Sequence, residues 1–140
     1  MPDSLLAHWP GVYFRQRPDF SFEFISDGIE QLTGVPPSTW QHQPKLFWQV
    51  VHELDADELR QQIKRLPPPP DGATLTYRVR NLRTGRVAYI SEFRRARTER
   101  GDALAGYEGF WQDVTRQTIA EMRLAAAAWK ETLADRKSVV

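Results

Sequence analysis

Three consecutive segments in residues 73–114 constrain the fold more than any other feature of the chain. In "ATLTYRVRNL", Leu75, Tyr77 and Val79 alternate with threonine and arginine. The segments "VAYISEFRRART" and "LAGYEGFWQDV" follow, and the turn sequences "RTGR" and "ERGDA" separate the three. Alternation with a period of two, interrupted by short turns, predicts an antiparallel three-stranded meander.

The second and third of these strands are apolar on both faces. Tyr89 and Ile90 have opposite parities in one strand, as do Phe110 and Trp111 in the next. A sheet that is apolar on both faces needs cover on both. Helices expected in the middle of the chain can cover one face, and the terminal helices are the candidates for the other.

The sequence before the meander predicts a hairpin and several short helices. "VYFRQR" and "FSFEFIS" are expected as strands, with Phe20, Phe22 and Phe24 alternating with polar residues. A short helix follows, capped by Ser26 or Asp27 and ended by glycine 34.

The middle of the chain predicts more helix. One turn is expected around Trp40, and "KLFWQVVHELDADELRQQIKRL" predicts two further helical pieces. Asp55 and Glu58 have the spacing of a capping box, and the four prolines at 67–70 favour an extended spacer. The chain is therefore expected to have an α+β fold: a five-stranded antiparallel sheet with short helices on one face and a C-terminal exit helix.

The transition from the last strand to that helix, "GYEGFWQDVTRQTIAEM", contains no residue that would make a flexible loop after the strand. Asp113 or Thr115 can accept hydrogen bonds from the free N–H groups at the helix start. A stiff joint is expected here.

The exit helix carries apolar residues at spacings of 3, 4, 3 and 4, which is the pattern of a coiled-coil seam. These seam residues are Ile119, Met122, Ala126, Trp129 and Leu133. The pattern predicts a homodimer. The alternative, in which the stripe folds back onto its own sheet, stays open, because about two heptads are marginal alone.

Composition excludes several functions. The chain has no cysteine, so disulfides and thiolate chemistry are excluded. A cytoplasmic protein without membrane contact is expected, since no apolar run could span a bilayer and the first residues do not resemble a secretory signal. The many arginines of residues 78–100 predict a solvated sheet face and turn, not a nucleic-acid surface, because no aromatic residues alternate with them.

The histidines do not indicate a catalytic or metal site. His8, His42 and His52 lack metal-ligand spacing. His52 lies near Asp55 and Asp57, but a capped helix start explains this cluster. No catalytic residue and no metal site are predicted. The alternative is a small α+β cone-type enzyme acting on a hydrophobic substrate with His52 as base.

Five stretches, in the right order over roughly residues 8–121, resemble PAS domains. They are "WPGVYF", "FEFISDGIEQLTG", "VVHELDADEL", "YRVRNLRTGRVAYI" and "GFWQDVT". The sequence departs from the family pattern at Glu53, Tyr89 and Arg116, where proline, tryptophan and glutamate are usual. The resemblance implies a bacterial sensory module of signal transduction, of the kind found in two-component systems and cyclic-dinucleotide signalling proteins.

The resemblance also implies an organisation and a relay. Residues 1–10 would form an N-terminal cap segment, 11–114 the sensory domain and 115–140 a linker helix. Gly109, Asp113 and Thr115 match the family's relay motif, which passes a signal into the helix. The module itself would not be an enzyme. Its effector, outside this chain, would be a histidine kinase or diguanylate cyclase, or the helix would lead to a second sensory domain.

No cofactor is predicted. In this family a photoactive flavin needs a cysteine, and this chain has none. Haem usually needs a histidine on the long helix, and the segment expected to form that helix, "DADELRQQIKRL", contains no histidine. A small-molecule ligand between helices and sheet remains an open alternative to a filled core. Its candidate lining residues are Phe24, Leu32, Trp40, Phe47, Trp48, Ile63, Tyr77 and Val79.

Overall fold

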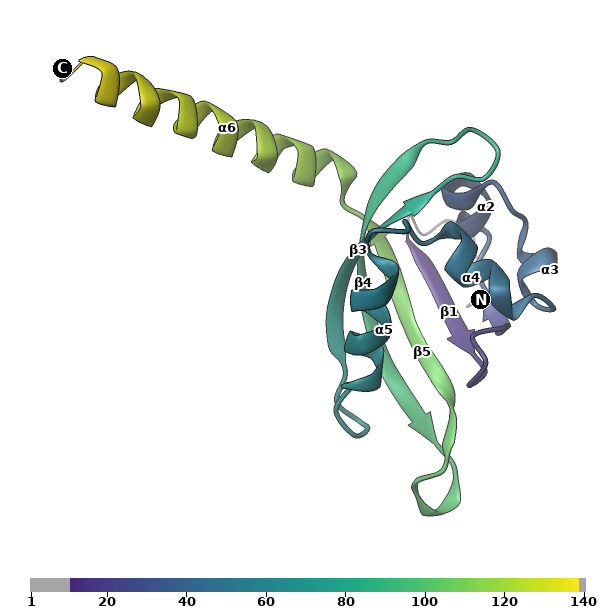
Figure 1. The fold of residues 1–140 in the computed structure, drawn as a ribbon. Helices are drawn as coiled ribbons and strands as arrows, with labels where there is room; N and C mark the ends of the chain where they lie inside the picture. Colours follow the sequence, from purple (N-terminus) through teal and green to yellow (C-terminus); the bar gives the residue numbers. More distant parts are fainter. Residues whose placement is uncertain (1–10, 139–140) are drawn as a thin grey trace.

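A computed structural model of the protein describes residues 11–138 (Figure 1). One antiparallel sheet contains five strands in the order β2-β1-β5-β4-β3. The strands are β1 (Val12–Gln16), β2 (Phe22–Ile25), β3 (Ala73–Arg80), β4 (Val87–Thr98) and β5 (Leu104–Asp113). The predicted hairpin and meander are confirmed. The cap segment expected at residues 1–10 lies outside the described residues.

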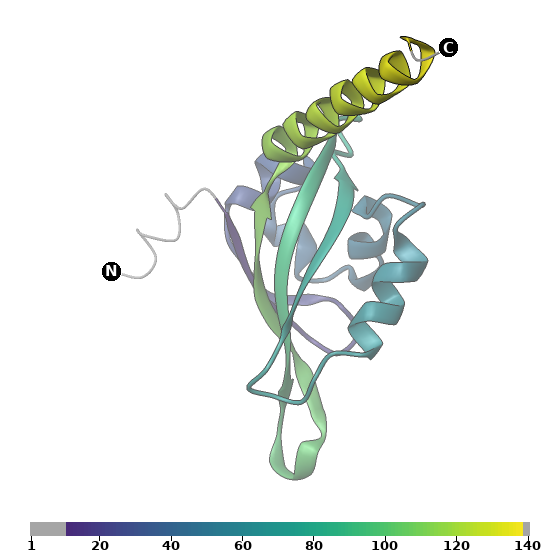
Figure 2. The same cartoon turned by 90° about the vertical axis from the view of Figure 1, so that its left-hand side faces the viewer.

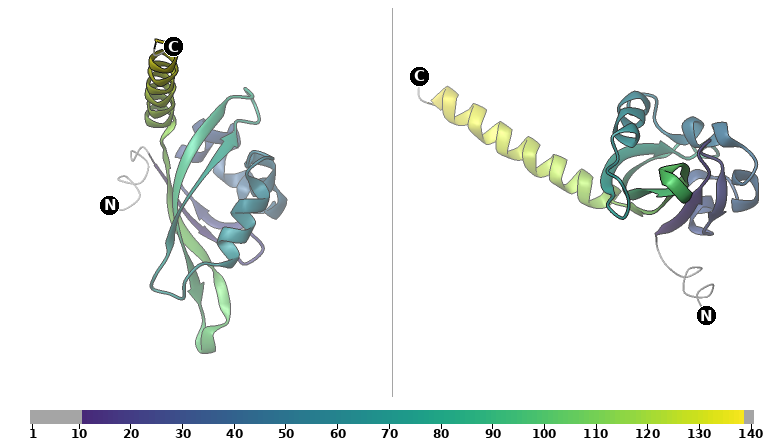
Figure 3. Two further views of the ribbon diagram at one scale, coloured as in Figure 1. Left: turned by 60° about the vertical axis from the view of Figure 1, so that its left-hand side comes forward. Right: turned by 90° about the horizontal axis from the view of Figure 1, so that it is seen from below.

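Four short helices lie on one face of the sheet, as predicted (Figure 2; left view of Figure 3). They are α2 (Gly28–Thr33), α3 (Pro37–Trp40), α4 (Pro44–Val50) and α5 (Ala56–Lys64). The predicted end of α2 at Gly34 is confirmed, because this residue adopts the left-handed conformation with φ of 79°. Between helices and sheet lies a core rich in aromatic residues, among them Phe14, Phe22, Trp40, Phe47, Tyr77 and Trp111.

The predicted caps of α2 and α5 are wrong. Neither Asp27 nor Asp55 makes a side-chain capping hydrogen bond. Oγ of Ser26, the other cap candidate for α2, accepts the backbone N–H of Tyr13 in β1 instead. The carboxylate of Asp55 instead accepts hydrogen bonds from Nε and Nη2 of Arg78, at 2.9 and 2.8 Å, and from the Arg78 backbone N–H at 2.8 Å. In a bidentate pair with arginine both partners are charged and two parallel hydrogen bonds form, so this aspartate fastens the start of α5 to β3.

Two further local predictions are wrong. Phe22 and Ile25 are buried while Phe24 is 39% exposed, so phenylalanines do not alternate inward along β2. The pairing register between β1 and β2 shifts next to Arg15, which changes the face that each side chain takes. The prolines at 67–70 form a bend and turn, not an extended spacer, and the Asp71 N–H donates to the Pro68 carbonyl.

Helix α6 (Thr115–Ser138) leaves the end of β5 and points away from the sheet (Figures 1 and 3). The expectation that terminal helices cover the second sheet face is therefore wrong for α6, and so is its fold-back onto the sheet. Among the described residues, that face carries two aromatic pairs, with Phe93 stacked on Phe110 at 5.6 Å and Tyr13 against Phe24 at 5.8 Å. Among the helices described, none has both the length and the apolar character needed to cross a bilayer.

Candidate functional site

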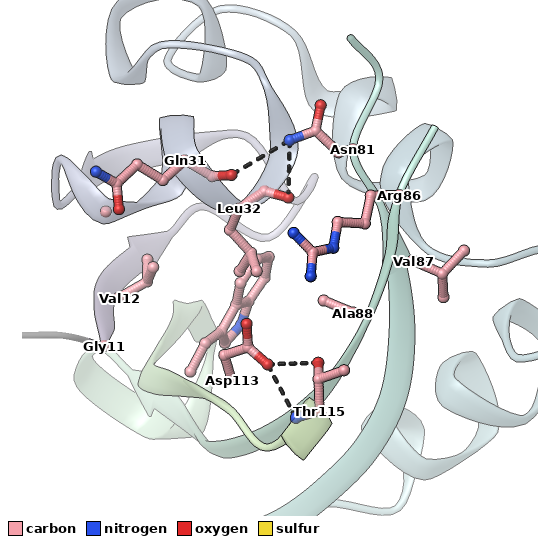
Figure 4. A pocket seen from close by; sticks show the side chains of 12 residues that line it. Gly11, Val12, Gln31, Leu32, Asn81, Arg86, Val87, Ala88, Asp113 and Thr115 are labelled. Atoms are coloured by element: carbon pink, nitrogen blue, oxygen red, sulfur yellow. Dashed lines mark hydrogen bonds between the residues drawn. The ribbon is translucent and has the colours of Figure 1, made fainter. Parts of the chain in front are cut away.

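The joint between β5 and α6 is fastened to the neighbouring strand β4. The backbone N–H of Val114 donates to the carbonyl of Tyr89 at 2.8 Å, and the Tyr89 N–H donates to Oγ1 of Thr115 at 2.9 Å. Asp113 accepts hydrogen bonds from the backbone N–H and the hydroxyl of Thr115 (Figure 4). The first turn of α6 is thereby held by backbone groups of the sheet.

Gly109, the first residue of the expected relay motif, lies where β5 runs between β1 and β4. It is opposite Phe14 on one side and Arg94 on the other. A Cβ atom on this glycine would collide with the backbone carbonyl oxygen of Phe93. The absence of a side chain is what allows β4 and β5 to approach here.

The predicted seam residues all lie along α6, beyond the joint. Trp129 is 60% exposed and Met122 is 53% exposed. Ile119, Ala126 and Leu133 are exposed as well. The helix therefore presents an apolar stripe that the described part of a single chain does not cover.

A buried ion pair occupies the interior between sheet and helices, and sequence reasoning missed it. Glu92 and Arg94 are both fully buried on β4, with Arg94 Nε 2.9 Å from Glu92 Oε2. Glu92 Oε1 accepts hydrogen bonds from the Tyr77 hydroxyl, Arg94 Nη2 and the Trp111 indole N–H. Arg94 Nη1 donates to Gln16 Oε1 at 2.6 Å. This polar network connects four of the five strands, β1, β3, β4 and β5.

Aromatic rings surround the guanidinium of Arg94. Its central carbon lies 5.0 Å from the Phe14 ring centroid, 5.4 Å from Phe47 and 5.2 Å from Tyr107, distances typical of cation–π contacts. Burial raises the pKa of Tyr107, and burial together with the Glu92 charge raises the pKa of Tyr77 well above its ordinary value. Both phenols therefore stay neutral and keep their hydrogens at physiological pH.

The candidate ligand-lining residues divide between this interior and its surroundings. Trp40, Phe47, Ile63, Tyr77 and Val79 are buried in the core, and Leu32 and Trp48 pack against it. Phe24 lies on the outer side, so its inclusion was wrong. Phe20, which was not included, stacks between Phe47 and Tyr107 at 5.9 and 5.5 Å. Whether any ligand enters this interior stays a prediction.

His52 has a structural setting. Its Nδ1 accepts the Leu54 backbone N–H at 3.1 Å, and its own backbone N–H donates to the Arg78 carbonyl at 2.8 Å. Its neighbour Asp55 is held by Arg78. Within residues 11–138, no group of three or more histidine, cysteine or acidic side chains could hold a metal ion. His8 lies outside the described residues.

Neither a protein-family model nor a curated protein matches the sequence. Solved structures do match. The N-terminal domain of a diguanylate cyclase with a PAS/PAC sensor from Marinobacter aquaeolei has a TM-score of 0.67 at 17% identity, over 77% of this chain and 98% of that one. A sensory box histidine kinase/response regulator from Burkholderia thailandensis E264 has 0.69 at 18% identity, over 87% and 90%.

A third match is a light-oxygen-voltage domain studied with a flavin analogue, with a TM-score of 0.59 at 16% identity, over 86% of this chain and 87% of that one. None of the three supports the cone-type enzyme. At these identities the matches support the fold alone. That fold agrees with the strand order and the single layer of helices described above. This chain has the fold of a PAS domain.

Proposed function

We propose that the chain is a sensory module of signal transduction that passes a change in its α/β domain through α6 to an effector domain. The observation that carries this proposal is the combination of a fastened joint at Thr115 with an uncovered apolar stripe beyond it. A helix held at one end by sheet backbone transmits movement of β4 and β5 to its far end. The similar structures from a diguanylate cyclase and a histidine kinase support an effector of one of these two classes.

The stripe is proposed to pair with the same helix of a second copy. The spacing of Ile119, Met122, Ala126, Trp129 and Leu133 is that of a two-stranded coiled coil. Burying one large apolar side chain stabilises an assembly by about 2 kcal/mol. A two-fold dimer buries both copies of each seam residue. An uncovered Trp129 is otherwise unfavourable for a protein in water.

Sedimentation of the chain at several concentrations tests the relay and its dimer. The wild type should show a concentration-dependent dimer, and the double variant Met122→Lys/Trp129→Lys should be a folded monomer, because neither side chain belongs to the core. Leu124→Lys is the matched control, since Leu124 is 72% exposed on α6 and lies off the seam. A wild type that is monomeric at all concentrations would contradict the seam, and with it a relay that works through paired α6 helices.

We also infer that no photoactive flavin or haem is held. Support comes from the chain itself: it has no cysteine for a flavin adduct and no histidine on α5. The buried pair of Glu92 and Arg94 further places charge in the middle of the interior. The absorbance spectrum of the purified chain tests this, and a flavin or Soret band would contradict it. Location in the cytoplasm stays a prediction.

A further inference from the structure

The arginines of residues 11–138 differ in their partners. Arg17 makes hydrogen bonds and Arg60 lies over the Trp48 ring, while several exposed arginines, Arg100 among them, make no side-chain hydrogen bond or ion pair. Five arginines of the sheet each form an ion pair with a carboxylate. The pairs are Arg78–Asp55, Arg80–Glu53, Arg94–Glu92, Arg95–Glu108 and Arg97–Glu23. In contrast, the guanidinium groups of Arg86, Arg116 and Arg123 make no hydrogen bond or ion pair with any residue in 11–138.

These three arginines line two adjoining cavities at the joint between sheet and α6. Both cavities include Gly11, Arg86, Asp113 and Thr115 in their walls. The inner one, of about 310 Å³, lies between the end of α2 and the start of β4. The outer one, of about 830 Å³, runs along the first turns of α6.

The inner cavity has apolar walls and a charged opening. Val12, Leu32, Val87 and Ala88 form much of the wall, and Figure 4 shows the Arg86 side chain reaching into this space from the β4 side. The amide side chains of Gln31 and Asn81 also border it.

The outer cavity adds Arg116 and Arg123, which lie seven residues apart and thus on one side of α6. The walls of the two cavities contain one carboxylate, that of Asp113. One of its oxygens already accepts two hydrogen bonds from Thr115. The combined wall carries a formal charge of +2. Unpaired like charges gathered around a cavity repel one another, and a bound anion would relieve that repulsion.

We propose that the joint cavities form a binding site for a small organic anion with one apolar end. The anionic head, a carboxylate or a phosphate, contacts Arg86 from the sheet and Arg116 and Arg123 from α6. The apolar body enters the inner cavity and lies against Leu32 and Ala88. The site is separate from the aromatic interior, where Arg94 is already paired.

This inference rests on the proposed function in one respect: only if α6 is a relay does the ligand act as a signal. An anion that contacts Arg86 and Arg123 together bridges the sheet and the helix across the joint. It would favour one orientation of α6 over others, because its affinity differs between orientations that do and do not bring the two arginines together.

Isothermal titration calorimetry of the full chain tests the site with hexanoate and hexyl phosphate as probes. Saturable binding of at least one probe is expected, and the tighter of the two identifies the head group. Arg86→Gln and Arg123→Gln should each weaken it by about tenfold, as is typical for loss of a charge-assisted contact. Arg100→Gln is the matched control, since Arg100 lies in the distant β4–β5 turn, and it should leave the affinity unchanged.

Two further probes separate the parts of the proposal. Inorganic phosphate should bind at least about tenfold more weakly than hexyl phosphate, because it cannot use the apolar wall, and hexylammonium should not bind. The proposal is overturned by absence of saturable binding up to about 10 mM, by equal affinity for hexylammonium or inorganic phosphate, or by equal loss in Arg100→Gln. Circular dichroism confirms that each variant is folded.

Failure of the site and failure of the relay give different results. Anion binding by a chain whose α6 never dimerises would support the site and contradict the relay. A dimer sensitive to Met122→Lys/Trp129→Lys that binds no probe would support the relay and overturn the site.

Discussion

The backbone N–H of Tyr89 donates a hydrogen bond to the side-chain hydroxyl oxygen of Thr115 at 2.9 Å. Tyr89 is in β4 and Thr115 is the first residue of α6, so a side chain of the helix replaces the strand partner that β5 no longer provides. Together with the Val114 N–H to Tyr89 carbonyl bond, it extends the pairing of β4 beyond the end of β5. The sheet and the exit helix are thus continuous through hydrogen bonds as well as through the chain.

Thr115→Val should loosen this joint. The substitution keeps the shape but removes the acceptor for Tyr89 and the donor to Asp113, so the free energy of unfolding should fall by about 1 kcal/mol. Amide hydrogen exchange should become faster at Tyr89. Thr132→Val removes a comparable hydroxyl from the middle of α6, where it donates only to the Ala128 carbonyl, and should leave Tyr89 unaffected. Unchanged exchange in Thr115→Val would show that the hydroxyl does not hold the joint.

Replacing Glu92 alone should be strongly destabilising. Glu92→Leu leaves the fully buried Arg94 without its counter-charge, a change that typically lowers the free energy of unfolding by about 3–5 kcal/mol. The double variant Glu92→Leu/Arg94→Met removes both charges and should recover a large part of the loss. Urea denaturation of the two variants and the wild type measures the difference. A double variant no more stable than the single one would show that the uncompensated charge is not the cause.

The ion pair of Asp55 with Arg78 should make stability depend on acid pH. Hydrogen bonds from Arg78 lower the pKa of Asp55 below its ordinary value of 3.8. A carboxyl whose pKa is lowered in the folded state stabilises fully above its unfolded pKa, and this stabilisation is lost as pH falls through the folded value. Between about pH 6 and about pH 3 the wild type should therefore lose more stability than Asp55→Asn. Parallel pH curves would contradict this assignment.

Gly109→Ala should destabilise the sheet although the change is one methyl group. The added Cβ meets the carbonyl oxygen of Phe93, which belongs to backbone and cannot turn aside. We expect a loss of several kcal/mol, at the upper end of about 1–3 kcal/mol for overpacking or beyond it, measured by thermal unfolding. Gly85→Ala provides the contrast, since no atom lies near a Cβ there and only its positive φ of 76° opposes the substitution.

The strand pattern was sufficient to predict the sheet because alternation in residues 73–114 leaves one register that buries Leu75, Tyr77 and Val79 together. The predicted turn at Gly85 and the start of the exit helix near Thr115 rest on equally local signals. The helix layer followed from the short helices expected in the middle of the chain and from an apolar sheet face that needs cover.

The buried ion pair between the sheet and the helices could not be predicted in the same way. Glu92 and Arg94 have the parity of Ile90 and therefore point inward, but charged residues in a strand are ordinarily assigned to solvent. Their burial depends on Tyr77, Gln16 and Trp111, which come from three other strands. The expectation of a solvated face was therefore wrong for Arg94, and only the assembled sheet reveals its partners.

The predicted caps failed for a related reason. Asp55 has the local spacing of a cap, but Arg78, 23 residues later, offers a bidentate partner that local spacing cannot reveal. Phe24 was misplaced because one irregular pair in β1 and β2 changes which side chains face inward. Long-range pairing and register shifts decided these positions, and neither is written in a short stretch of sequence.

Helix α6 makes the joint a pivot with a long arm. At 1.5 Å per residue its 24 residues extend about 36 Å from Thr115. A tilt of about 5° at the pivot would carry the far end sideways by about 3 Å over that length. Changes too small to disturb the packing of the sheet are thereby enlarged to the width of a side chain where the next domain would begin.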